Sequence, residues 1–380
     1  MKVAVSVHGR FHAFELARGL HRRGLLECLQ TTYPAYAARR IIGPGAVLHS
    51  APWLEVWRRL YPKLRPGRRP DLAIAQSFGR FAARSLRASP ADLLVGWSSA
   101  TLEAITPAQA AGMKVIIERG STHIVHQTDI LREEYRRCGK EFTATDPGII
   151  DRELREYEMA DAISVPSKLA ARSFTDRGIA ENKLIVTPLG VDPDRFRPAG
   201  NRPPNDIPRI LFVGSLGMRK GTPLLLRAFS RLKGKAELYL VGPVEAAFGS
   251  GPASLPLDNV VIPGPASGDA LSRHYAQADI FCLPSLEEGF GMVVLEAMAS
   301  GVPVVLSDVT GAADAVTPGE DGLVFPAGDE SALTNALEML IADPEKRRAM
   351  GSMARANVLA GYRWDDYIDR VIAAYEKLLL

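Results

Sequence analysis

The chain has few cysteines and no long apolar run, and each shortage excludes a class of protein. Its 380 residues include three cysteines without a CxxC pair, at Cys28, Cys138 and Cys282. This spacing argues against a disulfide scaffold or a structural zinc site and fits a reducing compartment. No run approaches the roughly 18 apolar residues of a membrane-spanning helix. The apolar stretch at residues 2–7 is too short for a signal peptide and predicts a buried first strand. We therefore expect a cytoplasmic protein.

Acidic residues are scarce at the start of the chain. Residues 1–90 carry 16 Lys and Arg against 4 Asp and Glu, whereas residues 91–380 carry 30 against 39. Because the net charge of the whole chain is only +3, this basic first quarter predicts an anionic neighbour. No recognisable nucleic-acid-binding module accompanies the charge, so we expect no nucleic-acid partner. An anionic membrane surface is the other anionic neighbour that fits this charge distribution.

Residues 53–65, WLEVWRRLYPKLR, combine aromatic and basic side chains. Helical spacing places five large side chains on one face, namely Trp53, Trp57, Leu60, Tyr61 and Leu64, with Arg58, Arg59 and Lys63 beside them. The pattern is typical of a helix that lies in a membrane interface. A core helix with solvated cations fits the same pattern, and the sequence leaves both interpretations open.

Short apolar runs alternate with helical stretches along the chain, which predicts an α/β fold with parallel sheets covered on both faces. The length is sufficient for two cores. Strands are expected at 2–7, 93–96, 114–118, 162–166, 183–187, 209–213, 236–241, 259–262, 280–283, 302–306 and 322–325. Residues 192–208 are rich in proline and lack apolar periodicity, so they predict a linker. The domains are then 1–191 and 209–363, followed by an amphipathic helix at 364–380.

A glycine-rich loop with two adjacent cations, VGSLGMRKGT, follows the strand 209–213. Arg219 and Lys220 stand just before a helix start, where phosphate oxygens bind well. The loop is not an NTPase P-loop, because Arg219 replaces the glycine before the lysine and Gly221 replaces the Ser or Thr after it. A solvated surface pair is the alternative interpretation.

The segment 284–299, PSLEEGFGMVVLEAMA, places Glu288 and Glu296 on either side of a glycine turn. Strand, glycine turn and helix direct backbone N–H groups toward an anion. The two acids would repel that anion and are better suited to accept hydrogen bonds from hydroxyls. The segment therefore predicts a nucleotide-sugar site. Favourable interaction of glutamate with the helix dipole is the simpler alternative.

This segment resembles the Glu-x7-Glu motif of retaining, family-4-type glycosyltransferases (glycosyl transferases group 1), which have the GT-B fold. The resemblance covers residues 211–328 well and the first domain more loosely. It implies two Rossmann-like domains facing across a cleft, with the last helix crossing back to the first. The family often carries an arginine directly after Val-Gly in the cation loop, where this chain has Ser215. Arg219 is then the expected guanidinium.

The resemblance also implies roles for individual residues. Glu296 would hold the ribose hydroxyls and Glu288 the sugar hydroxyls of the donor, whereas Glu287 falls outside the x7 spacing and is the less expected partner. Lys220 would stabilise the charge of the leaving diphosphate together with Arg219. The implied donor site comprises Gly9, Gly214, Ser215, Arg219, Lys220, Glu288, Gly289, Phe290, Gly291, Met292, Val293 and Glu296.

In the first domain, His123 follows the strand 114–118, and the resemblance implies that its ring lies near the anomeric centre of the donor. A surface histidine is the alternative, and a metal site with His126 lacks a third ligand. Where the family commonly has two glycines in the first turn, this chain has Gly9 and Arg10; Arg10 would contact an anionic acceptor or lie free on the surface. The implied catalytic set is His123, Arg219, Lys220 and Glu288, with Arg10 and His123 on the acceptor side.

Together these features predict a hexosyltransferase that moves a sugar from a nucleotide diphosphate sugar to an acceptor hydroxyl, with retention of configuration. The expected acceptor is a glycan or a lipid-linked molecule, in polysaccharide, glycolipid or cell-envelope glycan synthesis. We expect no metal or other cofactor, because two cations already neutralise the diphosphate. The expected location is cytoplasmic, or peripheral at the inner face of the membrane. The alternatives are a GT-B sugar-nucleotide epimerase and a membrane-associated, non-catalytic scaffold.

Overall fold

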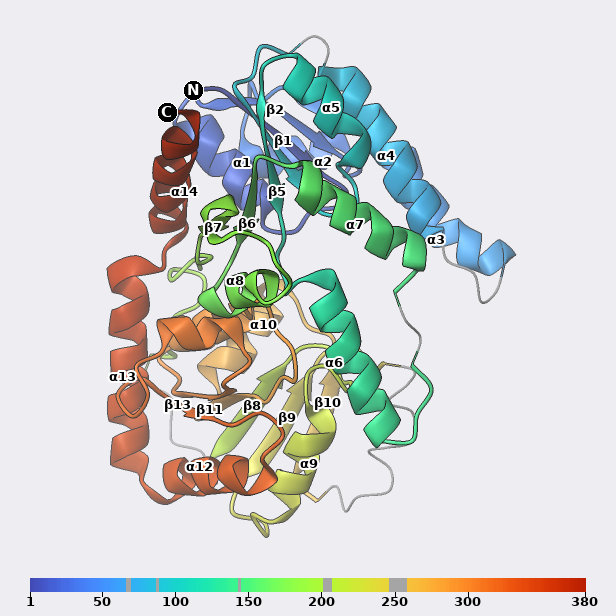
Figure 1. Ribbon diagram of the computed structural model, residues 1–380. Coiled ribbons are helices and arrows are strands. Elements are labelled where there is room, and N and C mark those ends of the chain that lie inside the picture. The colour runs from blue at the N-terminus through green and yellow to red at the C-terminus, as the bar shows by residue number, and fades with distance from the viewer. Residues whose placement is uncertain (66–69, 87–88, 143–144, 201–206, 246–257) are drawn as a thin grey trace.

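The computed structural model describes residues 1–65, 70–86, 89–142, 145–200, 207–245 and 258–380. Within these residues the strands form two sheets, each covered by helices (Figure 1). The strand order is β3-β2-β1-β4-β5-β6-β7 in the first sheet and β10-β9-β8-β11-β12-β13 in the second. Neighbouring strands pair in parallel, and the expected α/β class is confirmed.

The first sheet contains β1 (Val3–Val7), β2 (Leu26–Thr31), β3 (Leu48–Ser50), β4 (Leu93–Trp97), β5 (Lys114–Glu118), β6 (Ala162–Val165) and β7 (Leu184–Val186). The second contains β8 (Arg209–Val213), β9 (Glu237–Val241), β10 (Val260–Gly264), β11 (Ile280–Leu283), β12 (Val304–Ser307) and β13 (Gly322–Phe325). Every residue of β1, β4, β11 and β12 is buried. Helices cover both faces of such strands, which explains their continuous apolar sequences.

The helices of the first domain are α1 (Ala13–Arg22), α2 (Ala35–Ile42), α3 (Pro52–Leu64), α4 (Asp71–Leu86), α5 (Leu102–Ala110), α6 (Ile124–Arg137), α7 (Pro147–Met159) and α8 (Lys168–Thr175). Those that follow are α9 (Thr222–Ser230), α10 (Gly268–Ala276), α11 (Met292–Ala299), α12 (Glu330–Ala342), α13 (Pro344–Gly361) and α14 (Trp364–Leu379), with the 3-10 turns η1 (Glu181–Lys183) and η3 (Gly311–Ala315). No helix in the described ranges is long and apolar enough to cross a membrane.

The sequence pattern does not indicate strands β2 and β3. The sequence of β2 mixes apolar residues with Glu27 and Gln30. Gln30 is buried, and its Nε2 donates a hydrogen bond to Ala82 O at 3.2 Å, which offsets the cost of burying the amide. β3 has only three residues, LHS, and lies at the edge of the sheet. A buried polar side chain with a partner and a short edge strand both escape a search for apolar runs.

The chain crosses between the two domains twice, and the two crossings touch. Val191 N donates a hydrogen bond to Tyr362 O at 2.9 Å, and Val191 forms an isolated parallel bridge with Arg363. A Cβ on Gly190 would lie 2.7 Å from Arg363 O, so glycine permits this approach. The stretch 192–208, expected to be a linker, joins β7 to β8, and its residues 201–206 lie outside the described part.

After the second crossing, α14 continues along the first domain, so the two chain ends lie near each other (Figure 1). It packs on α1 where Gly19 leaves space for Ile368; a Cβ on Gly19 would lie 2.3 Å from Ile368 Cγ1. α6 runs the other way, from the first domain down beside α9 of the second (Figure 1). Helices α6 and α14 therefore contribute to the contacts between the two domains, in addition to the loops.

Candidate active site

Two loops of the second domain are locked together beyond the carboxyl ends of the neighbouring strands β8 and β11. Leu286 N donates a hydrogen bond to Arg219 O at 2.9 Å. Gly221 has a φ of +68°, and a Cβ on it would lie 1.8 Å from Pro284 O. Only glycine accommodates both the conformation and the approach. The structure thus brings the cation loop and the Glu-x7-Glu segment into one site.

Arg219 and Lys220 face two consecutive glutamates. Lys220 Nζ pairs with Glu288 Oε2, while Arg219 Nη1 lies 3.4 Å from Glu287 Oε2 and 3.6 Å from Glu288 Oε2. The Lys220 side chain is only 12% exposed. Burial and the adjacent Arg219 lower the pKa of Lys220, whereas Glu287 and Glu245 oppose that shift. Two basic and two acidic side chains therefore lie together, and the Arg219 side chain, at 32%, is the most exposed of the four.

Helix α11 begins beside this cluster. Gly291, its N-cap, has a φ of +93°. The first N–H groups of a helix have no acceptor within the helix, so the backbone of Met292 and Val293 can meet an anion here. Phe290 is 2% exposed and belongs to the apolar core, so its ring supports the turn and does not face a ligand. Phe290, which the resemblance placed among the donor-binding residues, therefore contributes a buried ring beneath the turn.

Glu296 lies one helical turn further along α11 and is half-buried. Tyr275 OH donates a hydrogen bond of 2.8 Å to Glu296 Oε2. Burial raises the pKa of Glu296, although Tyr275 and Arg195 act in the opposite direction. Tyr275 engages one carboxylate oxygen and thereby fixes the orientation of the group.

Gly214 and Ser215 open the cation loop. Gly214 N donates to Val241 O at 3.0 Å, and a Cβ on Gly214 would lie 3.7 Å from Lys220 Cε. Gly214 therefore lies beneath the Lys220 side chain. Ser215 is half-buried and precedes Leu216, whose N–H donates to Pro243 O at 2.8 Å.

Glu287 reaches into the first domain. Its Oε1 accepts hydrogen bonds from Ser121 Oγ at 2.8 Å and from Thr122 Oγ1 at 2.7 Å, and its Oε2 accepts one from Gln127 Nε2 at 2.8 Å. Burial alone would raise its pKa, but Arg219 and these hydrogen bonds lower the pKa of Glu287 to about 2. One buried carboxylate thus joins the two domains. Motif spacing directed attention to Glu288 and gave no sign of this contact.

The neighbouring turn completes the contact between domains. A Cβ on Gly289 would lie 2.3 Å from Ser121 Cα, so any side chain there would push the domains apart. Ser167 Oγ donates to Gly289 O at 2.7 Å, and Lys168 N donates to Asp314 Oδ2 at 2.6 Å. The absence of a side chain at Gly289 therefore permits the close approach of the two domains.

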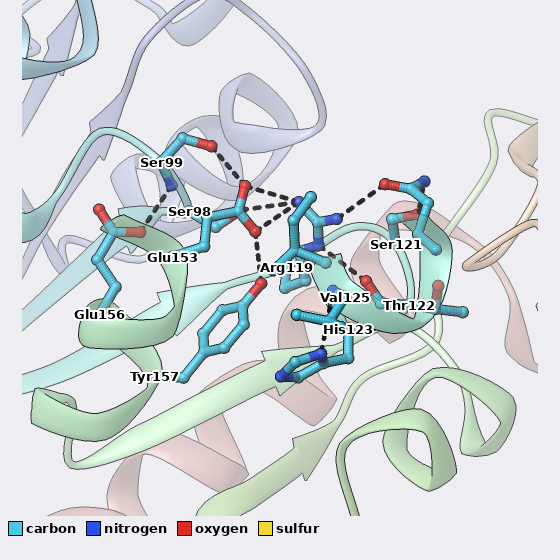
Figure 2. Close-up of polar contacts among 12 residues, drawn as sticks. Ser98, Ser99, Arg119, Ser121, Thr122, His123, Val125, Glu153, Glu156 and Tyr157 are labelled. Carbon is cyan, nitrogen blue, oxygen red and sulfur yellow. Dashed lines mark hydrogen bonds and ion pairs between the residues drawn. The ribbon is translucent and has the colours of Figure 1, made fainter. Parts of the chain in front are cut away.

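A buried ionic network supports this contact from the first domain (Figure 2). Arg119 Nη1 lies 2.9 Å from Glu153 Oε2, and Arg119 Nη2 donates to Gln127 Oε1 at 3.2 Å. Tyr157 OH also donates to Glu153 Oε2, at 2.5 Å. Since Gln127 binds Glu287 as well, the network continues from the first domain to Arg219. Arg119 directly follows β5, and that position at the carboxyl end of a strand is the signal that could have indicated it.

The structure places the ring of His123 inside the first domain, where it is buried. It caps α6, with Nδ1 accepting a hydrogen bond from Val125 N at 3.2 Å, and packs 5.2 Å from Tyr157 and 5.0 Å from Phe174 between ring centres. Figure 2 shows the ring directed toward Tyr157. Burial, with Arg177 nearby, lowers the pKa of His123 to about 4, so the ring is neutral at neutral pH. In this structure it has a packing role in the first domain.

The turn after β1 lies at the same edge of the first sheet. Gly9 has a φ of +111°, and its carbonyl accepts a hydrogen bond from Thr31 Oγ1 at 2.8 Å. Arg10 is exposed. His12, which the sequence did not single out, is buried with Nε2 3.0 Å from Glu118 Oε1. In the described ranges no three His, Cys, Asp or Glu side chains are placed to hold a metal ion.

Comparison with known proteins agrees with this geometry. The family model for glycosyl transferases group 1 matches residues 194–357. An MMP alpha-(1->4)-mannosyltransferase of Mycolicibacterium hassiacum is 32% identical over 233 residues, covering 58% of this chain and 55% of the relative. A D-inositol 3-phosphate glycosyltransferase of Kineococcus radiotolerans is 30% identical over 296 residues, covering 68% and 67%. The alignments to several of these curated relatives span little more than half of the relative's length.

Solved structures share the fold over the whole chain. A sucrose-phosphate synthase from Thermosynechococcus elongatus superposes with a TM-score of 0.74 at 20% identity, covering 100% of this chain and 99% of that one. Anabaena HepE in complex with UDP-glucose superposes with a TM-score of 0.69 at 17% identity, covering 99% and 100%. Both support the expected GT-B arrangement. With its two Rossmann-like domains and its match to the Kineococcus relative over two thirds of both chains, this chain belongs to the group 1, family-4-type glycosyl transferases.

Proposed function

We propose that the protein is a retaining glycosyltransferase that moves a sugar from a nucleotide diphosphate sugar to an acceptor hydroxyl. The observation that carries the proposal is the position of Arg219 and Lys220, held by the loop after β11 beside the start of α11. The relatives named above are transferases, and a structural neighbour was solved with UDP-glucose. None of them is named as an epimerase or a scaffold.

The chemistry asked of the site is charge stabilisation. A departing nucleoside diphosphate gains negative charge as its bond to the sugar breaks, and preorganised cations and helix N–H groups stabilise that charge in a site with little water. Glu287 and Glu288 pair with the two cations in the structure. The diphosphate would take Lys220 from Glu288, whose carboxylate then becomes available for the sugar hydroxyls.

Replacing Lys220 by alanine should lower turnover by about 100-fold, because removal of one such stabilising group typically has that effect. The matched control is Arg227→Ala, which removes a cation from the same region of the second domain. Arg227 is 49% exposed, and its side chain pairs with Glu330 and not with either glutamate of the site. Transfer rates of both purified variants decide the matter; near-normal turnover of the Lys220 variant would contradict the assignment of the diphosphate site.

The two glutamates of the motif should fail in different ways. Tyr275 orients Glu296 on α11, which suits a carboxylate that accepts two hydrogen bonds from a ribose diol. We expect Glu296→Gln to weaken binding of nucleotide diphosphate alone, measured by calorimetry. Glu288→Gln should spare that affinity and lower transfer. Equal losses of nucleotide affinity in both variants would show that the division of roles is wrong.

Glu287→Gln should loosen the closed arrangement of the domains. The amide would place an N–H donor where Gln127 and Arg219 now donate to Oε2, and a hydrogen bond to a charged group is worth about 2 kcal/mol. Turnover should fall, and small-angle scattering should report a larger radius of gyration. Glu320→Gln, on an exposed turn, is the control. An unchanged radius with unchanged turnover would dismiss the role of Glu287 in closure.

The pH dependence of this contact follows from the lowered pKa of Glu287. Because its pKa in the folded protein, about 2, lies below the ordinary value of 4.5, ionised Glu287 contributes its full stabilisation above that ordinary value. The contribution decreases as the pH falls from about 4.5 toward 2. At neutral pH the contact is therefore insensitive to small pH changes.

Metal independence is part of the proposal, since Arg219 and Lys220 supply the positive charge that a divalent ion would otherwise provide. Transfer should therefore persist in excess EDTA. The measurement is the rate before and after chelation, followed by addition of magnesium or manganese. A complete loss that either metal restores would show that the protein uses a metal ion.

The acceptor is proposed to be a glycan or lipid-linked hydroxyl, in polysaccharide, glycolipid or cell-envelope glycan synthesis. It would enter between the donor loops and the turn that contains Gly9 and Arg10 at the carboxyl end of β1. A cytoplasmic location, with reversible attachment to the inner face of a membrane, is consistent with the basic first quarter of the chain.

A further inference from the structure

Helix α3 has an apolar stripe that the fold does not use. Trp53, Val56, Leu60 and Leu64 are 57%, 55%, 49% and 77% exposed. Their spacing of three and four residues places them on one side of the helix. Single exposed apolar residues are ordinary, but four aligned on one helix form a patch that requires explanation.

The packing needs of α3 are met by another side of the helix. Leu54 is 3% exposed and packs, with Trp57 at its margin, into a small core that contains Ile74 and Phe78. The sequence pattern had grouped Trp53, Trp57, Leu60, Tyr61 and Leu64 on one face. The structure separates them: Trp57 supports the core, while Trp53, Leu60 and Leu64 face outward. The core interpretation therefore holds for one side of the helix, and the membrane interpretation remains a prediction for the other side.

Cations border the exposed stripe. The side chains of Arg58 and Arg59 are 52% and 76% exposed, and Lys63 and Arg65 are also exposed. Residues 52–65 hold four cations and one acid, Glu55, so their net charge is +3 (4 − 1). Glu55 pairs with both arginines, at 2.6 and 3.2 Å, without cancelling the excess. Long basic side chains can lie along apolar groups while their charged ends reach phosphate.

The start of α3 is connected to the turn after β1 through a row of aromatic rings. Aromatic contacts connect Trp53 to Phe81 at 5.9 Å, Phe81 to Phe78 at 5.9 Å, and Phe78 to His8 at 6.4 Å between ring centres. His8 belongs to the turn after β1. Figure 1 shows α3 projecting from the side of the first domain.

Two more exposed aromatics follow the neighbouring strands. Phe11 and Tyr36, which are 63% and 70% exposed, come after β1 and β2 just as Trp53 comes after β3. The carboxyl ends of adjacent parallel strands share one edge of a sheet. Phe11 and Tyr36 therefore lie at the same edge of the first sheet as the start of α3.

We propose that the outer side of α3, extended by Phe11 and Tyr36, is a docking surface for an anionic lipid bilayer. Its apolar side chains would enter the boundary between headgroups and acyl chains, and its cations would pair with lipid phosphates. A second copy of the chain fits less well, because a symmetric contact would place net +3 against net +3. The proposal does not depend on the transferase activity.

Sedimentation of the full chain with vesicles tests the surface. The probes are phosphatidylcholine vesicles with and without phosphatidylglycerol. We expect binding to the anionic vesicles only, weakening as ionic strength approaches physiological values, where the Debye length is about 8 Å. The fluorescence of Trp53 should shift to shorter wavelength on binding and be quenched by brominated lipid.

The decisive variant is Val56→Ser, Leu60→Ser and Leu64→Ser together, which leaves the cations and Trp53 in place. It should bind anionic vesicles at least about tenfold more weakly. The matched control, Met339→Ser with Met353→Ser, changes side chains of the second domain that are 45% and 51% exposed and should bind normally. Transfer to a soluble acceptor should be unchanged in both variants.

Three results would overturn the proposal. The protein could remain in the supernatant with anionic vesicles at low salt. The triple variant could bind as well as the unaltered chain, which would show charge attraction without insertion. The unaltered chain could be a dimer that the triple variant dissociates, which would assign the stripe to a second copy. Because vesicle binding requires neither donor nor acceptor, each result leaves the proposed transferase activity to its own tests.

Discussion

The closed arrangement of the two domains depends on one buried carboxylate. Glu287 is 1% exposed and accepts hydrogen bonds from both domains at once. Burying a charge costs free energy unless partners surround it, and breaking such a set by removing one member is strongly unfavourable. Separation of the domains would remove the hydrogen bonds of Glu287 to Ser121, Thr122 and Gln127 together. The contact therefore stabilises the arrangement of the domains that the structure shows.

The same carboxylate separates the tasks of the two adjacent glutamates. Thr122 and Gln127 of the first domain donate hydrogen bonds to the Glu287 carboxylate, so Glu287 contributes to the contact between the domains. Among the described residues, the side chain of Glu288 pairs with Lys220 and Arg219 of its own domain, and its carbonyl accepts a hydrogen bond from Gly311 N at 2.9 Å. On the proposed function, a diphosphate competes with Glu288 for Lys220 but leaves the partners of Glu287 in the first domain intact. Donor binding can then change the chemistry of the site without opening it.

The sequence alone predicted the features that depend on residues close together in the chain. Apolar runs marked the strands buried on both sides, and β8 and β11 proved to be neighbours, which is why the two glycine loops after them meet. β2 was not indicated, because Gln30 is buried against a distant carbonyl. The partners of Glu287 could not be predicted either, since they lie 160 to 166 residues away in the chain. The ring direction of His123 depends likewise on packing against Tyr157 and Phe174.

The two crossings of the chain between the domains hold each other at one place. Both crossings pass one place, where Val191 donates to Tyr362 O and Gly190 lies against Arg363. Arg370 Nη2 adds a hydrogen bond to Pro188 O at 3.0 Å, so α14 travels with the first domain. The domains meet again at the other side of the site, where Gly289 lies against Ser121 without space for a side chain. Their relative position is therefore fixed at two separate places in the structure.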